Sequence, residues 1–446
     1  MSQKNVFSSL SVRRPLVLLI ILMIGLATTG LGYVIWTTHG AMNGNGSGTE
    51  VNIVSSGLER ETAPDVSSEE LAALIKSNNG FALDLYQEIR DEDGNLFYSP
   101  YSISLALSMT YAGARAETEQ QMAETLHFTL SQERLHPTFN ALDLALTGYG
   151  HENEENFTLN ITNALWGQNG INFKKEFLDV LAVNYGAGMR LLDFQTNPEA
   201  ARIKINDWVS EQTENKIKDL IPEGAIDMWT VLVLTNAIYF KAAWMYAFPE
   251  WGTQDGTFTL LDGTQITVPM MSWPQAVSIR YGEGDDYQAV ELPYEGTSMS
   301  MLILMPVRDR FEEFESMLSA ERVNEIVENL GSRYVLVTMP KFEFEASLDL
   351  KSTLAEMGMP VAFTYQADFS GITTDCSLWI DEVLHKAFVS VDEKGTEAAA
   401  ATAVIMTSGI SPSPVEISID HPFIFLIRDD DTGTILFLGR VLDPTA

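Results

Sequence analysis

The chain is short of cysteine and of positive charge. Its 446 residues include a single cysteine, Cys376, so no intramolecular disulfide can stabilise the fold and a CxxC metal or redox site is excluded. Only 27 lysines and arginines stand against 61 aspartates and glutamates, which gives a formal net charge of −34 at pH 7. A basic footprint for nucleic acid is therefore not expected. The acidic surface favours solubility, and basic partners over acidic ones.

Compact catalytic and metal-binding motifs are also missing. The six histidines follow no HExxH or other close ligand spacing, and the sequence has no GxSxG nucleophile turn and no Walker phosphate loop. A triad assembled from distant positions is the one catalytic alternative that stays open. We therefore expect a protein that is not an enzyme and that needs no metal or other cofactor.

A long uncharged segment lies near the N-terminus. Residues 15–36 contain no charged side chain, and Lys4, Arg13 and Arg14 precede them. This length can span a bilayer as a helix, and the basic flank predicts a cytoplasmic tip and an exported remainder. The apolar run continues to Trp36, which favours an uncleaved signal-anchor; a cleaved signal peptide is the alternative. The protein would then be anchored to the outer face of the cell membrane or secreted.

Three regions follow from the composition along the chain. Residues 1–37 would form the cytoplasmic tip with the signal-anchor or signal peptide, and residues 38–66 are polar and Gly/Ser-rich, as in a flexible linker. Residues 67–446 have enough apolar side chains for a large core. Within them helical patterns dominate early and strand patterns late, without regular alternation, which predicts an α+β fold. The clearest patterns are helical at 100–112, 174–185 and 199–213 and strand-like at 157–166 and 231–239.

Two helical patterns contain residues that disfavour helix. The pattern that opens with the capping signature at Ser67 is interrupted at Asn78-Asn-Gly80 and resumes at Phe81. Another runs from Pro137 to Leu146, with proline at its first position. The sequence thus predicts a break in the first helix and a start at Pro137 for the second.

The most informative segment is Val391-Asp-Glu-Lys-Gly-Thr-Glu-Ala-Ala-Ala-Ala-Thr-Ala-Val404. A charged turn begins it, and from Ala398 to Ser411 there is neither a charge nor a proline. Small and β-branched side chains would allow the segment to enter a sheet as a strand, with alternate residues on opposite faces. A helix is the alternative because alanine is the best helix former, although Val404, Ile405 and the following prolines disfavour it. Such a segment suits a surface loop in one state and a central strand in another.

The segment also resembles the reactive-loop hinge of the serpins, and other strings resemble that family in the same order. They are Asn95-Leu-Phe-Tyr-Ser-Pro-Tyr-Ser-Ile-Ser104, Thr235-Asn-Ala-Ile-Tyr-Phe-Lys-Ala-Ala-Trp244, Met339-Pro-Lys-Phe-Glu343, Ala367-Asp-Phe-Ser-Gly-Ile372, His385-Lys-Ala387 and His421-Pro-Phe-Ile-Phe-Leu426. The resemblance covers about residue 67 to the end. It implies a serpin fold with a large central β-sheet, two further sheets, about eight or nine helices and an exposed reactive-centre loop at about 393–416.

The resemblance also implies roles for particular residues. The hinge of the loop would comprise Glu393, Gly395, Thr396, Glu397, Ala398, Ala399, Ala400 and Ala401. A polar cluster beneath the central sheet, called the shutter in that family, would comprise Asn95, Ser99, Ser102, Asn236 and His385. Loop insertion would begin at the breach, marked by Trp244 and by a charge pair of Lys341 with Glu393. Counting about sixteen residues on from Glu393, as the family pattern suggests, puts the reactive bond between Gly409 and Ile410.

By this resemblance the protein is expected to inhibit a serine endopeptidase as a suicide substrate. The protease would be trapped as an acyl-enzyme when the cleaved loop inserts into the central sheet. No lysine or arginine lies between Ala398 and Glu416, which favours elastase-like or subtilisin-like targets, with a papain-like cysteine protease second. The inhibitor is expected to be a monomer. A non-inhibitory serpin that acts as a binding module is the main alternative, and the small residues Ala398 to Ala401 disfavour it.

Overall fold

The computed structural model describes residues 51–148, 157–396 and 413–446. These residues contain nine α-helices, and most of them come early in the chain, as predicted. The helices are α1 (Ser68–Ile89), α2 (Pro100–Tyr111), α3 (Ala116–Thr125), α4 (Gln132–Gly148), α5 (Lys175–Tyr185), α6 (Pro198–Gln212), α7 (Phe311–Ser316), α8 (Ala320–Asn329) and α9 (Lys351–Glu356).

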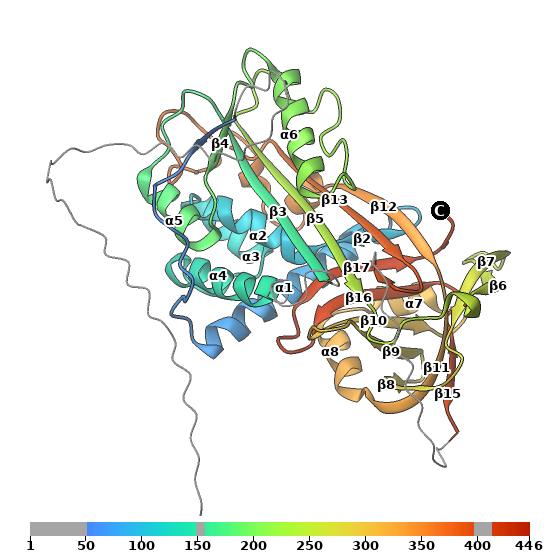
Figure 1. The fold of residues 1–446 in the computed structure, drawn as a ribbon. Helices are drawn as coiled ribbons and strands as arrows, with labels where there is room; N and C mark the ends of the chain where they lie inside the picture. Colours follow the sequence, from blue (N-terminus) through green and yellow to red (C-terminus); the bar gives the residue numbers. More distant parts are fainter. Residues whose placement is uncertain (1–50, 149–156, 397–412) are drawn as a thin grey trace, which may run out of the picture. The chain divides into compact units, whose positions relative to one another are not determined.

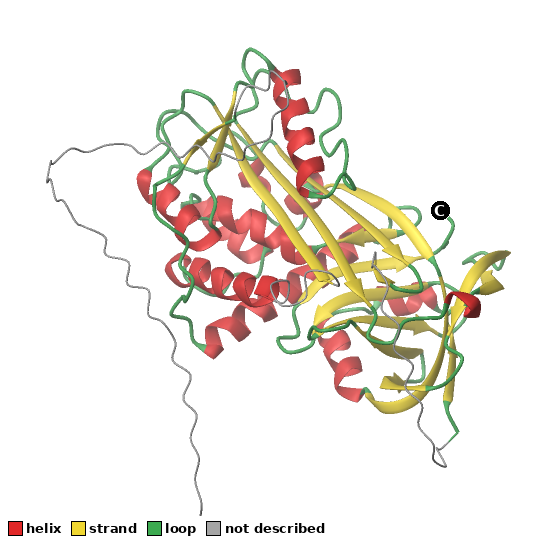
Figure 2. Cartoon of the chain, in the orientation of Figure 1, coloured by secondary structure: helices red, strands yellow, loops and turns green. Residues whose placement is uncertain are grey.

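The site is built around a mixed seven-stranded sheet, called here the central sheet. Its long strands run diagonally through Figure 2. In spatial order the strands are β1 (Asn52–Val54), β4 (Met189–Leu192), β3 (Phe157–Gln168), β5 (Leu232–Ala243), β14 (Gly395–Thr396), β13 (Glu382–Val391) and β12 (Phe342–Asp349).

The other ten strands form one hydrogen-bonded path that has two parts. Strand β11 links the parts, because its first half pairs with β8 and its second half with β7. The predicted α+β fold, with a large sheet and further sheets, is confirmed. The path is β2 (Leu96–Tyr98), β17 (Ile435–Val441), β16 (Phe423–Asp429), β10 (Met299–Pro306), β9 (Tyr287–Pro293), β8 (Val277–Glu283), β11 (Gly331–Pro340), β7 (Gln265–Ser272) and β6 (Gln254–Thr259), with β15 (Val415–Ser418) paired to β11.

The two faces of the central sheet belong to different hydrophobic cores. Leu234 and Ile238 of β5 enter the larger core, to which α2 also contributes. Val233 and Ala237, which alternate with them, enter a smaller core with α6. Helix α6 therefore covers one face of the sheet and α2 the other, as can be followed in Figure 1. This burial on both faces explains why β5 is apolar along nearly its whole length.

Part of the range expected to be a flexible linker is held against the folded domain. Strand β1 pairs antiparallel with β4 at the edge of the central sheet. Further along, the Arg60 guanidinium donates hydrogen bonds to Asn140 and Asp143 of α4, each at 2.7 Å. We call residues 51–66 the N-terminal strap. The predicted membrane segment 15–36 lies outside the described residues, and within them no helix is both long and apolar enough to cross a bilayer.

Helices α1 and α4 differ from the predicted patterns. Helix α1 continues through Asn78-Asn-Gly80 without a break. The Asn79 carboxamide donates to the Gly433 carbonyl at 2.8 Å and accepts from the Ile435 N–H at 3.0 Å, so its polar side chain is satisfied by a distant hairpin. Helix α4 begins before Pro137, which lies inside it. Tertiary packing thus overrides local preferences that would end a helix in isolation.

Candidate functional site

The strand β14 stands between β5 and β13 at one end of the central sheet. Thr396 pairs antiparallel with Ala242 of β5 on one side and with Val391 of β13 on the other. Away from β14, β5 and β13 pair directly with each other, parallel, over six register positions that end at Ile238 and Ala387. The two strands are therefore separated at one end and joined at the other.

The chain just before β14 is fixed by hydrogen bonds to Glu393. Its carboxylate accepts from Lys341 Nζ at 2.8 Å and from Thr253 Oγ1 at 2.6 Å, and its carbonyl accepts from the Phe248 N–H at 2.8 Å. Burial alone would raise the pKa of Glu393, but the bonds from Lys341 and Thr253 outweigh it, so this pKa is lowered. The charge pair is partly buried, with 10% of the Glu393 side chain exposed against 37% for Lys341.

An aromatic pair packs beside β14. The indole of Trp244, at the end of β5, stacks on Tyr294 with 4.7 Å between ring centroids, and its N–H donates to the Asp392 carbonyl at 3.0 Å. The Tyr294 hydroxyl is 2.7 Å from Thr396 Oγ1, and both side chains are buried. The Thr396 side chain therefore points into the core of the domain.

A buried polar cluster lies where β5 and β13 are joined. The Asn236 carboxamide of β5 donates to Ser102 Oγ of α2 and to Asn163 Oδ1 of β3, both at 2.7 Å. Asn236 Oδ1 accepts from His385 Nδ1 of β13, and the two residues are register partners across the joint. The Ser99 N–H donates to His385 Nε2 at 3.1 Å. These five residues are called the polar cluster from here on.

The local sequence explains how α2 enters the cluster. Ser99 caps α2, and its hydroxyl accepts from the Ser102 N–H at 3.2 Å and donates to the Leu436 carbonyl at 2.6 Å.

Burial lowers the pKa of His385 to about 3, so the ring is neutral at pH 7. A neutral ring can donate from one nitrogen and accept at the other, as the contacts to Asn236 and Ser99 require.

Four of the five residues expected in the shutter come together, and Asn95 does not join them. Asn95 instead donates to the Asp443 carbonyl and accepts from the Leu442 N–H, both at 2.7 Å, near the end of the chain. Conversely, sequence reasoning missed Asn163. It lies opposite Asn236 in the β3–β5 register. The signal that could have found it is a polar side chain within a strand whose other residues are largely buried.

Several predicted site residues lie outside the described part of the chain. These are the hinge residues Glu397 to Ala401 and the expected reactive bond, Gly409–Ile410. Within the described part, no group of three or more histidine, cysteine, aspartate or glutamate side chains could hold a metal ion.

Comparison with known proteins identifies the class to which this fold and site belong. A family model described as Serpin (serine protease inhibitor) matches residues 76–444, so the chain belongs to the serpin family. An uncharacterized serpin-like protein of Thermococcus kodakarensis is 43% identical over 374 residues, which are 83% of this chain and 86% of that protein. Leukocyte elastase inhibitor of Sus scrofa is 39% identical over 380 residues, covering 83% of this chain and 99% of the pig protein. The crystal structure of tengpin, a thermophilic serpin, in the native state matches with a TM-score of 0.79 and 28% identity, over 89% of this chain and all of that one.

Proposed function

We propose that this protein inhibits a serine protease as a suicide substrate. The protease attacks a bond in the loop that follows β14 and forms an acyl-enzyme. The severed segment then enters the central sheet between β5 and β13, carries the attached protease with it and distorts the protease active site before deacylation. Barriers to this rearrangement, rather than equilibrium, preserve the uncleaved protein.

The observation that carries this proposal is the double pairing of β14. Strand β14 is antiparallel to both of its neighbours, while β5 and β13 are parallel to each other. A strand that continued β14 toward the polar cluster would therefore find a matching ladder on both edges. The small residues of the hinge, Ala398 to Ala401, suit such a strand because they bury without a charge. The name of the pig relative, leukocyte elastase inhibitor, supports an inhibitory function and a target that accepts small apolar residues.

Two arginine variants test whether insertion is required. The Thr396 side chain enters the core, so alternation along an inserted strand would bury Ala400 and turn Ala399 to the opposite face. We expect A400R to be cleaved as a substrate without trapping the protease, because a buried guanidinium has no partner there. A399R adds the same charge one residue away, on the face where the neighbouring Lys241 and Phe388 are only partly buried, so it should retain much more of the inhibition.

The assay is a panel of elastase-like and subtilisin-like serine proteases, with a papain-like cysteine protease included, scored for SDS-resistant adducts. Mass spectrometry of the released peptide locates the cut, which we propose to be the Gly409–Ile410 bond. A wild-type protein that is cleaved by the panel without any adduct would refute inhibition and favour a non-inhibitory binding module. Full adduct formation by A400R would refute insertion.

We also propose an export route and a monomeric state for the inhibitor. Residues 1–37 would be a signal-anchor or signal peptide, and the serpin domain of residues 67–446 would lie outside the cytoplasm. The uncharged run of residues 15–36 after three basic residues supports this. N-terminal sequencing of the mature protein separates an anchored from a cleaved form, and protein found only in the cytoplasm would contradict both. Light scattering tests the monomer.

A further inference from the structure

A half-buried arginine without an anionic partner lies on the central sheet. Arg190 of β4 forms no hydrogen bond and no ion pair with any residue that the structure describes. Every other arginine in the same part of the chain donates a hydrogen bond or lies in an ion pair. The chain has 61 aspartates and glutamates, so a shortage of acidic side chains does not explain the missing partner. Burial lowers the pKa of Arg190, and no carboxylate offsets this cost.

Two indole rings hold this guanidinium in place. Its central carbon lies 4.4 Å from the ring centroid of Trp208 on α6 and 5.5 Å from that of Trp166 on β3. The two rings pack edge to face, with 5.2 Å between their centroids. Contacts of this kind use the faces of the guanidinium, whereas its N–H groups lie in its own plane. The indoles therefore fix the direction of the donors without using any of them.

A second cation and an exposed apolar side chain lie next to Arg190. Lys204 precedes Trp208 by one turn on the same flank of α6, and it forms no hydrogen bond or ion pair with a described residue. Ile53 of β1 is the register partner of Arg190, so the two side chains share a face of the sheet, and Ile53 is 50% exposed. Figure 1 shows α6 beside β3 and β4. Two positive charges and an apolar surface thus border the same place.

These groups suit a small oxyanion that carries an apolar or aromatic body. A phosphate monoester has a charge of about −1.5 to −2 at pH 7 and three acceptor oxygens. The guanidinium fork and the ammonium group can both donate to such oxygens. The net charge of −34 repels an anionic bilayer or an acidic protein. A small soluble anion responds mainly to the nearby cations, because salt screens charges beyond about 8 Å.

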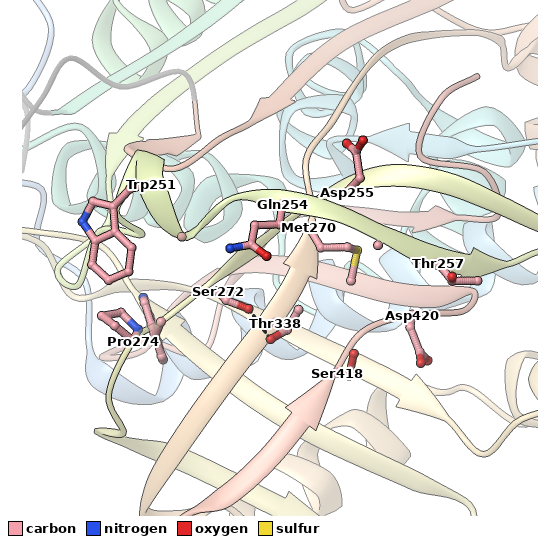
Figure 3. Close-up of a pocket in the computed structure, with 13 residues that line it drawn as sticks. Trp251, Gln254, Asp255, Thr257, Met270, Ser272, Pro274, Thr338, Ser418 and Asp420 are labelled. Atoms are coloured by element: carbon pink, nitrogen blue, oxygen red, sulfur yellow. Dashed lines mark hydrogen bonds between the residues drawn. The ribbon is translucent and has the colours of Figure 1, made fainter.

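A pocket of about 540 Å³ beside β6, β7 and β15 has the opposite character. Figure 3 shows Asp255 and Asp420 among its lining residues. None of the described residues that line it is an arginine or a lysine, so it offers an anion no positive charge of its own.

We propose that Arg190, Lys204 and Trp208 form a binding site for a soluble phosphate monoester with an aromatic or apolar body. The anion would bridge β4 and α6 and would thereby stabilise the fold in which α6 covers the central sheet. The site contains no residue of the hinge, the breach or the polar cluster. The proposal therefore stands or falls independently of the inhibitory function.

The test titrates the full chain with phenyl phosphate in a calorimeter, at about 50 mM NaCl so that screening is weak. Inorganic phosphate and phenol, titrated in parallel, separate the anionic from the aromatic part of the probe. The variants are R190Q, R190K and K204Q. K76Q is the control of equal charge change to R190Q and K204Q, because Lys76 is exposed on α1, a helix of the larger core.

We expect R190Q to weaken the binding of phenyl phosphate by at least about 10-fold and K204Q by about 3- to 10-fold, because each loses a charge-assisted hydrogen bond. R190K should lie between R190Q and the wild type, since an ammonium group keeps the charge but not the planar fork. K76Q should bind as the wild type does. Phenyl phosphate should also raise the melting temperature of the wild type and of K76Q, and raise that of R190Q much less.

Equal affinities of the wild type, R190Q and K204Q would overturn the site, as would a wild type that does not bind phenyl phosphate. If R190Q is too unstable to titrate, K204Q decides the case, because its side chain lies at the edge of the core. Phenol that binds as tightly as phenyl phosphate would overturn the anionic character of the ligand. Flotation with phosphatidate vesicles but not with phosphatidylcholine vesicles, without binding of phenyl phosphate, would replace the soluble ligand by a lipid headgroup.

Discussion

Lowering the pH from 7.5 to 5.0 should destabilise the native protein through two buried histidines. His385 and His136 are 1% and 3% exposed. Burial lowers the pKa of each to about 3, and for His136 the nearby Arg115 adds to the effect. In the unfolded chain both histidines take up a proton near pH 6.5, whereas in the native protein they stay neutral down to about pH 3. The stability that the two neutral histidines contribute is therefore fully present above pH 6.5 and is lost progressively as the pH falls toward 3.

The magnitude follows from the two pKa values. At pH 5.0 each histidine lowers the free energy of unfolding by about 2 kcal/mol relative to pH 7.5. Asp430 acts in the opposite direction, because burial first, and then Glu291, raise its pKa to about 6. Its native form is protonated before the unfolded form, which adds up to about 1 kcal/mol as the pH falls to 5.0. The net loss expected for the wild type is about 3 kcal/mol.

The assay is the rate of unfolding in a fixed urea concentration, followed by tryptophan fluorescence at both pH values. In H385N, and likewise in H136N, the destabilisation between pH 7.5 and pH 5.0 should be smaller than in the wild type by about 2 kcal/mol. This difference corresponds to a change of up to about 30-fold in the unfolding rate. S99A is the control, because it weakens the polar cluster without removing a titrating group. It should unfold faster at both pH values and keep the wild-type pH dependence. An H385N protein that responds to pH as strongly as the wild type would refute the reasoning.

Three further substitutions probe contacts that hold the rest of the domain together. E315Q should cost about 3 kcal/mol, because Arg440 loses a buried carboxylate partner 2.8 Å away; an unchanged melting temperature would contradict this. G113A should cost about 1–3 kcal/mol, because the new Cβ would lie 2.0 Å from Ile372 Cγ1, and the urea midpoint measures the loss. R60A should lower the urea midpoint by about 1 kcal/mol, because the strap loses its partly buried ion pair with α4. It should also expose residues 51–66 to limited proteolysis. If R60A and the wild type were cleaved there at equal rates, the ion pair would not be what holds the strap against α4.

Elements with strong local signals could be predicted from the sequence. The range 100–112 became α2, because Ser99 is a good cap, Pro100 suits the first turn and the rest is apolar. The apolar run 231–239 lies almost wholly within β5, which continues to Ala243 because both of its faces are buried there.

The rest depends on contacts between distant parts of the chain. The short strand β1 has only three residues and none of them is buried, and it exists because β4 offers an open sheet edge. The resemblance grouped Asn95 with the polar cluster, but its partners are residues near the C-terminus that no local pattern connects to it. Asn163 belongs to the cluster through strand register, and the register of β3 against β5 is set by the whole sheet.

The position of the polar cluster bears on how the proposed insertion would be controlled. Opening the sheet breaks the ladder between β5 and β13, which has six register positions, whereas an inserted strand would pair along both of its edges, as β14 already does. Each added ladder bond contributes about 1 kcal/mol net, so insertion gains stability once it has begun. The bond between Asn236 and His385 crosses the joint, and it must break before the ladder on either edge of the new strand can form there. Its bonds to Ser102 and Asn163 do not cross it, so they can hold Asn236 in place on the β5 side while the joint opens. The cluster would therefore act mainly on the barrier to insertion, and the length of the two new ladders would set the energy that insertion releases.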